Sequence, residues 1–336
     1  TSTPSGGVAR PIVPYAELHC RSNFSFLEGA SHPEELAEEA HRLGLTALAV
    51  TDRNGLYGIV RFAEVARALS MPTVFGAQLE CDEGDIVVLS RNPRGYGHLA
   101  SAISDGQLAG SKDEPVFRID RLAEFSGDGW WVLTGARSGA VTRAMHRDGP
   151  AAAERVVQRL IAACGRDNVL VELWDHGDPL DSVRNDELVR IAHRNGLSCV
   201  ATNDVLYAVP AQHRLANAVA AVRRRGSLDD IDASLPPAAM AYVRSGSEQH
   251  RRFARYPGVV SMAAEVGRDA AFDLRLVAPK LPPFPCPDGL GEMEYLRRLV
   301  EVGAVRRYGA RPVGGEDLSL RSRAWRTIDH ELEVIA

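Results

Sequence analysis

Seven short apolar runs rich in β-branched residues alternate with amphipathic helical stretches along the first 205 residues of the 336-residue chain. This alternation is typical of a parallel sheet covered by helices. It predicts an α/β fold in which βα units repeat around a distorted seven-stranded barrel. An antiparallel ribbon between Asp85–Arg91 and the run before it is an alternative for the fourth strand. The seven runs are Tyr15–Cys20, Ala47–Thr51, Thr73–Leu79, Ile86–Leu89, Trp131–Thr134, Val169–Leu173 and Cys199–Asn203.

Helix start and stop signals separate these runs. The clearest helix is predicted at Pro33–Leu43, with Ser31 as its N-cap and Gly44 as its stop. The other helices predicted between and after the strands are Ile59–Leu69, Ala151–Cys164, Asn185–Asn195, Ala211–Arg225, Glu248–Arg255 and Val259–Asp269.

A proline-rich segment, Pro279–Pro287, indicates a stiff connector near the end of the barrel region. Two further helical segments follow it, at Glu292–Arg307 and Arg321–Ile335. We therefore expect a flexible leader over residues 1–14 and a barrel with helical trimmings over 15–278. Residues 279–336 are expected to contain the connector and the first helices of a second structural unit.

Composition excludes several classes of protein. A net charge of -5 does not describe a general nucleic-acid binder, for which a basic domain or face is expected. The five cysteines form no C-x-x-C pair, which argues against a zinc finger and a disulfide framework and favours a reducing cytoplasm. No run approaches the ~18 apolar residues that span a bilayer, so no membrane association is expected.

Several segments resemble the PHP (polymerase and histidinol phosphatase) domain, in particular the N-terminal domain of bacterial DNA polymerase III alpha-type subunits. They are similar to the error-prone, damage-inducible branch of that family, often called ImuC. The resemblance implies that the chain folds as a PHP barrel and that the polymerase body begins within residues 279–336. It also implies that the polymerase active site is absent from this chain. The segments are LEGASHPEELAEEAHRLGL, LYGIVRFAE, SRNPRGYGHL, ATND, FDLRLVAPKLPPFP and HELEVIA.

Active members of the family hold a trinuclear metal cluster at the strand ends, and the resemblance transfers those positions to this chain. Three plausible ligands remain, His19, Glu28 and Asp204, with Glu28 in place of an aspartate. Asp52 also remains, but Arg53 stands at the next position, where the family motif has a histidine. The other altered positions are Arg21, Gln78, Asp85, Ala136 and Leu206.

The two arginines among these positions argue against metal binding, because a guanidinium is always charged and cannot coordinate a metal. We expect no cofactor and no catalytic residue, with a single zinc or manganese ion as the alternative. Arg21 and Arg53 are expected to pair with Glu28, Asp52, Asp85 or Asp204 in place of the metals. His176 is expected on a surface loop.

Three functions are compatible with this sequence. The leading interpretation is a non-catalytic domain of an error-prone DNA polymerase active in damage-induced translesion synthesis, which supplies stability and a docking surface. A residual metal-dependent 3'-5' exonuclease or phosphoesterase is one alternative, and a stand-alone regulatory paralogue is another. The resemblance implies the remainder of the polymerase as partner, with DNA reached through it, and also suggests accessory mutagenesis proteins and the sliding clamp.

Overall fold

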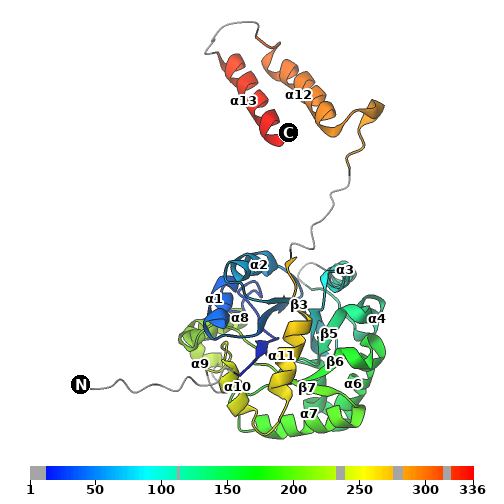
Figure 1. Ribbon diagram of the computed structural model, residues 1–336, viewed down its shortest axis with the longest axis vertical. Coiled ribbons are helices and arrows are strands. Elements are labelled where there is room, and N and C mark those ends of the chain that lie inside the picture. Colours follow the sequence, from blue (N-terminus) through cyan, green and yellow to red (C-terminus); the bar gives the residue numbers. More distant parts are fainter. Residues whose placement is uncertain (1–12, 112–113, 232–238, 275–282, 313–318) are drawn as a thin grey trace, which may run out of the picture. The chain divides into compact units, whose positions relative to one another are not determined.

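Seven strands form one sheet in the computed structural model, which describes residues 13–111, 114–231, 239–274, 283–312 and 319–336 (Figure 1). The strands lie side by side in the order in which they occur along the chain, and this confirms the predicted seven-stranded α/β fold. They are β1 Ala16–Glu17, β2 Ala47–Arg53, β3 Thr73–Cys81, β4 Gly84–Ser90, β5 Trp130–Leu133, β6 Val169–Leu173 and β7 Ser198–Ala201.

Strand β4 differs in direction from the others. It runs antiparallel to both β3 and β5, whereas the remaining neighbouring pairs are parallel. The antiparallel alternative for Asp85–Arg91 is therefore confirmed. Because of this reversal, Asp85 near the start of β4 lies at the edge where the parallel strands end, opposite Glu80 of β3.

The sheet closes between β1 and β7. A parallel bridge joins Cys20 to Val205, just beyond the two strands. In it, the backbone N–H of Arg21 donates to the carbonyl of Val205 at 2.9 Å, and the N–H of Val205 donates to the carbonyl of His19 at 2.8 Å. Helix α11, Val259–Asp269, packs against β1, β2 and β7 and covers this seam. A single bridge thus joins the two edges of the curled sheet just beyond the carboxyl ends of β1 and β7.

Helices surround the sheet on its outer side (Figure 1). Those predicted from the sequence are present and differ by a few residues at their ends. The predicted N-cap Ser31 is wrong: His32 is the N-cap of α1, and the hydroxyl of Ser31 donates instead to Gln212 at 2.7 Å. The helices of this region besides α11 are α1 Pro33–Arg42, α2 Ile59–Ala68, α3 Pro93–Ala109, α4 Ile119–Ser126, α5 Ala140–Asp148, α6 Pro150–Cys164, α7 Asp181–Asn195, α8 His213–Arg224, α9 Leu228–Ile231 and α10 Gly246–Arg252.

Four of these helices, α3, α4, α5 and the short α9, were not predicted. Glycines in α3 lower its helix propensity, but two of them allow close packing. A Cβ atom on Gly95 would lie 2.0 Å from the carbonyl oxygen of Gly129, and one on Gly106 would lie 2.2 Å from the ring of Phe117. Tertiary packing therefore determines α3 where local propensity does not.

Residues 278–336 form a second compact unit, distinct from residues 1–277. Its helices are α12 Glu292–Tyr308 and α13 Leu320–Ile335. Trp325 is buried and donates its indole N–H to the carbonyl of Gly309 at 3.3 Å. Most of the expected leader and the first part of the proline-rich connector lie outside the described residues. Among the described residues, none of the helices is both long and apolar enough to cross a membrane.

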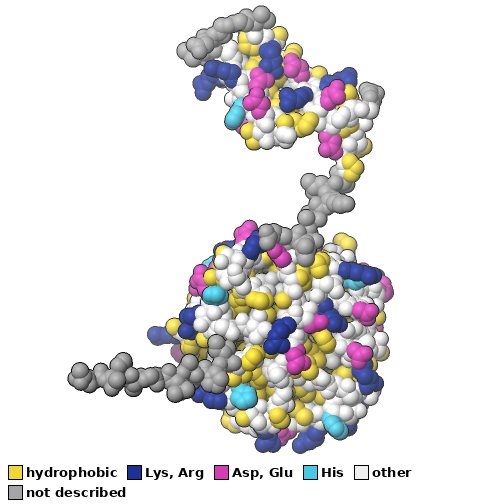
Figure 2. Space-filling model, in the orientation of Figure 1, with side chains coloured by type: hydrophobic (Ala, Val, Ile, Leu, Met, Phe, Trp, Pro, Cys, Tyr) yellow, Lys and Arg dark blue, Asp and Glu magenta, His cyan; other side chains and the backbone are white. Residues whose placement is uncertain are grey.

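The surface carries charges of both signs. Figure 2 shows basic and acidic side chains interspersed over the face that it draws. No extended single-sign region is visible on that face among the described residues. This mixture agrees with the modest net charge of -5. Among the described residues, the face that Figure 2 draws shows no extended basic patch of the kind that binds nucleic acid.

Candidate functional site

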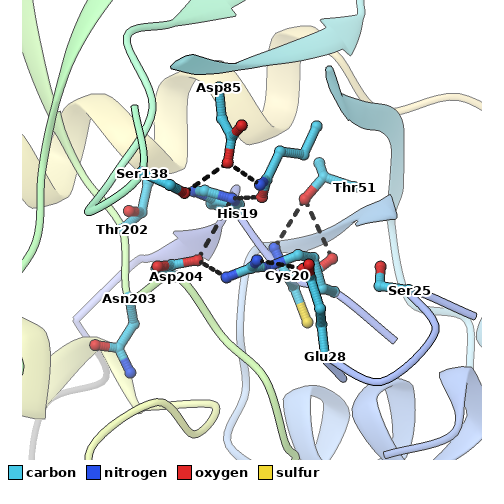
Figure 3. Close-up of polar contacts among 12 residues, drawn as sticks. His19, Cys20, Ser25, Glu28, Thr51, Asp85, Ser138, Thr202, Asn203 and Asp204 are labelled. Carbon is cyan, nitrogen blue, oxygen red and sulfur yellow. Dashed lines mark hydrogen bonds and ion pairs between the residues drawn. The ribbon is translucent and has the colours of Figure 1, made fainter. Parts of the chain in front are cut away.

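The carboxyl ends of the parallel strands bring most of the predicted site residues together (Figure 3). Residues from β1, β2, β3 and β7 meet there, and the reversed β4 adds its first residues. This is the end at which barrel proteins place their reactive groups. The residues that meet are His19 and Arg21 after β1, Glu28 in the following loop, Asp52 and Arg53 in β2, Gln78 in β3, Asp85 in β4 and Asp204 after β7.

Arg21 lies between two carboxylates. Its Nη1 donates to Glu28 at 2.8 Å and its Nη2 donates to Asp204. The exposed fractions of these three side chains are only 10%, 4% and 10%. Burial raises the pKa of Asp204, but Arg21 and His19 outweigh it and lower that pKa to about 2. Both carboxylates are therefore ionised partners of the guanidinium at neutral pH.

Glu28 is shared by three arginines. Besides Arg21, it accepts from Arg53, which also donates to Glu80 at the end of β3. The third is Arg223 in α8, whose Nη1 lies 2.7 Å from a Glu28 carboxylate oxygen. Burial favours the neutral acid, but the three guanidinium groups hold the pKa of Glu28 below its usual value. This arginine–carboxylate cluster joins the loop after β1 to β2, the end of β7 and α8.

His19 has hydrogen-bond acceptors on both ring nitrogens. Its Nδ1 lies 2.7 Å from a Glu172 carboxylate oxygen, and its Nε2 lies 2.8 Å from the side-chain oxygen of Gln78. The Gln78 amide is oriented in this way because its NH₂ group donates to Asp85 at 2.6 Å. Burial lowers the pKa of His19, but Glu172 and Asp204 raise it to about 9. His19 is thus an imidazolium at neutral pH.

Glu172 was missed by the sequence analysis. It is the fourth of the five residues of β6 and has no exposed surface. The hydroxyl of Thr202 donates to the same oxygen that accepts from His19, at 2.5 Å. A carboxylate inside an otherwise apolar strand could have identified it, because buried charges are almost always paired.

Glu17 in β1 is a second buried carboxylate that was not predicted. It accepts from the Tyr15 hydroxyl at 2.7 Å and from the backbone N–H groups of His19 and Asn203 at 3.0 and 3.2 Å. Burial raises its pKa to about 7. Its contacts link the ends of β1 and β7, so Glu17 reinforces the seam where the barrel closes.

Asp52 and Asp85 are held by neutral donors, whereas both had been expected as alternative partners of the arginines. Asp52 accepts from the backbone and hydroxyl of Ser22 and from the hydroxyl of Ser25 at 2.8 to 3.0 Å. Asp85 accepts from Gln78 and from the hydroxyl of Ser138. Burial raises the pKa of both carboxyl groups.

The remaining positions lie at the margin of the cluster. Ala136 is buried after β5, and Leu206 packs in a small apolar group with Ala30. The expected surface position of His176 is wrong: it is only 4% exposed, and its Nε2 lies 2.7 Å from the Asn203 carbonyl. Burial lowers the pKa of His176, which favours a neutral ring.

Replacing Thr202 with valine is expected to lower the free energy of unfolding by about 2 kcal/mol, since a buried carboxylate loses a hydroxyl donor while the side-chain volume stays similar. Chemical denaturation followed by circular dichroism measures the change. Thr46→Val, at a half-buried position in the same unit, is the control and is expected to change stability by under ~0.5 kcal/mol. Equal effects of the two substitutions would contradict a role of Thr202 in holding Glu172.

The carboxylates among the candidate metal ligands are engaged with other side chains. No group of three or more His, Cys, Asp or Glu side chains in the described part of the chain is arranged to hold a metal ion. Glu28 and Asp204 direct their oxygens at guanidinium groups, and both ring nitrogens of His19 lie within hydrogen-bond distance of side-chain oxygens. Metal ligands of these types must be deprotonated and free to donate.

Comparisons with known proteins identify relatives of this chain. The family model described as the PHP domain matches residues 17–176. An error-prone DNA polymerase of Mycolicibacterium paratuberculosis is 45% identical over 98% of this chain and 31% of its own length. One of Mycobacterium tuberculosis is 47% identical over 96% of this chain and 30% of its own length. The chain therefore spans about 30% of the length of these relatives.

Among solved structures, an amidohydrolase from Chromobacterium violaceum is similar with a TM-score of 0.39 and 16% sequence identity, over 57% of this chain and 87% of that one.

Proposed function

We propose that this chain, which carries a PHP domain and is related in sequence to error-prone DNA polymerases, serves as the non-hydrolysing N-terminal PHP domain of such a polymerase. In this role it stabilises the protein and offers a docking surface, while the remainder of the polymerase carries out DNA synthesis across damage. DNA, accessory mutagenesis proteins and the sliding clamp are reached through the whole polymerase, in the cytoplasm.

The position of Arg21 is the observation that carries this proposal. Its guanidinium lies between Glu28 and Asp204, two of the three plausible ligands. Two unit charges about 4 Å apart repel each other by roughly 4 kcal/mol at a surface-like dielectric, so a divalent metal ion at that distance would be repelled by about twice as much. Since the guanidinium never loses its proton, a change of pH does not free the two carboxylates for a metal ion.

The same contacts support a structural role. Arg21 directly follows the bridge that closes the barrel, and Asp204 directly precedes it. The ion pair therefore fixes the seam between β1 and β7, while Arg223 attaches α8 to the loop that carries Glu28. Removing metal ions from a ring of carboxylates leaves repulsion between them, and the arginines supply the missing positive charge.

A nuclease assay tests the proposal. The 336-residue chain is incubated with end-labelled single-stranded and primer-template DNA in the presence of manganese or zinc, beside a His19→Ala variant. We expect no metal-dependent shortening of DNA by either protein. Shortening by the unaltered chain that His19→Ala abolishes would contradict the proposal and support a residual 3'-5' exonuclease.

A further inference from the structure

A hollow of about 370 Å³ lies beside the arginine–carboxylate cluster, at the mouth of the barrel. Glu28, Arg53 and Arg223 are among its lining residues, so part of the cluster is exposed there to a second molecule. Phe26 and Tyr57 line its rim. The hollow is thus bordered by both charged and aromatic side chains.

The rim exposes aromatic surface. The exposed fractions of Phe26 and Tyr57 are 82% and 61%. A single exposed apolar residue needs no explanation, but two large aromatic rings around a polar hollow are typical of an interaction site. Tyr57 is also held in place, because its ring packs so closely on Gly55 that a Cβ atom there would lie 2.2 Å from it.

The loops that present these side chains are fixed in unusual backbone conformations. Leu27, between Phe26 and Glu28, has φ 60°, and Asn54, which lines the hollow, has φ 53°. A bulky residue with positive φ is uncommon and persists only where its surroundings hold it. Ser25, at the start of the first loop, donates to the buried Asp52 at 2.8 Å. Phe26 is therefore presented by a rigid loop.

The two arginines and two glutamates that line the hollow balance in charge, but the guanidinium of Arg223 is exposed enough to bind one anionic group of a ligand. Arg223 pairs with Glu28 through Nη1, yet its side chain remains 47% exposed. A guanidinium has five N–H donors in a planar fork that matches a carboxylate, so Arg223 retains donors that face the solvent. Arg53 is 27% exposed on the same hollow.

We propose that this hollow is a docking site for a short peptide segment of a partner protein, with an aromatic or aliphatic side chain packed between Phe26 and Tyr57 and a single carboxylate on Arg223. The proposal rests on the docking role proposed above and gives it a location and a chemistry. A peptide that brings one carboxylate suits the hollow better than a nucleic acid. Glu28 and Glu80 lie among the arginines and would repel a row of adjacent phosphates, whereas a single carboxylate can reach Arg223 alone.

A displayed library of random 12-residue peptides, selected against the full 336-residue chain, tests the proposal. The selected peptides are then titrated by fluorescence anisotropy against the unaltered chain and against Phe26→Ser and Arg223→Ala. Val183→Ser and Arg190→Ala are the matched controls, because Val183 and Arg190 are similarly exposed on α7. Phe26 is so exposed that its substitution leaves folding intact, which circular dichroism verifies.

We expect the selected peptides to combine Asp or Glu with an aromatic or aliphatic residue. Phe26→Ser and Arg223→Ala are each expected to weaken their binding at least about tenfold, and the controls less than about twofold. Selection of basic peptides, or binding that Phe26→Ser leaves unchanged, would overturn the proposal. Binding of a 15-nucleotide oligo(dT) that depends on the same two residues would overturn it in favour of nucleic acid. None of these outcomes involves metal or hydrolysis, so failure here is distinguishable from failure of the nuclease test.

Discussion

Alanine in place of Arg21 is expected to lower the free energy of unfolding of the barrel by about 3–5 kcal/mol, the usual result of removing one partner from a buried ion pair. The substitution leaves Asp204 buried with His19 at 3.5 Å as its remaining cationic neighbour. Glu28 keeps Arg53 and Arg223, so most of the loss is expected at the seam between β1 and β7.

Chemical denaturation measures the total loss, and hydrogen exchange of peptides from β1 and β7 locates it. Arg42→Ala is the matched control, because Arg42 pairs with Glu39 on the exposed side of α1, and its substitution is expected to change stability far less. Arg21→Lys retains the charge without the planar fork of the guanidinium. Its loss of unfolding free energy is expected to lie between those of Arg21→Ala and Arg42→Ala. An Arg21→Ala variant as stable as Arg42→Ala would show that the cluster does not hold the barrel mouth.

Raising the pH from about 6.5 to 9 is expected to destabilise the barrel by roughly 3 kcal/mol through His19 alone. The pKa of this ring is about 9 in the folded protein and about 6.5 in an unfolded chain. Over this range the folded state holds a proton that the unfolded state has released, so stability decreases as pH rises. The contribution is fully present below pH ~6.5 and is lost as the pH passes the folded pKa.

Urea unfolding at a series of pH values, for the unaltered chain and for His19→Gln, isolates this effect. The difference in unfolding free energy between the two proteins is expected to shrink from pH 6.5 to 9. His41→Gln, on the exposed part of α1, provides the control. Its unfolding free energy is expected to change with pH in the same way as that of the unaltered chain. A constant difference between the unaltered chain and His19→Gln would show that His19 is not an imidazolium in the folded protein.

The fold was largely predictable, because strand and helix periodicities are local properties of the sequence. The exceptions depend on tertiary packing. The glycines of α3 disfavour a helix in isolation but allow its contacts with Gly129 and Phe117. The predicted β1 run ended at Cys20, yet the ladder stops at Glu17 and only an isolated bridge continues it.

The candidate site was predictable where the resemblance supplied positions, and less so where partners come from distant parts of the chain. The residues Arg21, Glu28 and Asp204 were expected to lie together, and the structure brings them into contact. Glu28 also pairs with Arg223, which lies 195 positions further along the chain (223 − 28), and no local pattern indicates this contact. Glu172 and His176 were misjudged because the burial of a polar residue near a strand end depends on the closed barrel.

Metal content per chain tests the central claim, that arginine–carboxylate pairs take the place of a metal cluster. The purified 336-residue chain is incubated with zinc and manganese, desalted and measured by inductively coupled plasma mass spectrometry, and its melting temperature is recorded with and without EDTA. The proposed cluster predicts less than one tightly bound ion per chain and an unchanged melting temperature after chelation. Two or more ions per chain, whose removal by EDTA lowers the melting temperature, would contradict it.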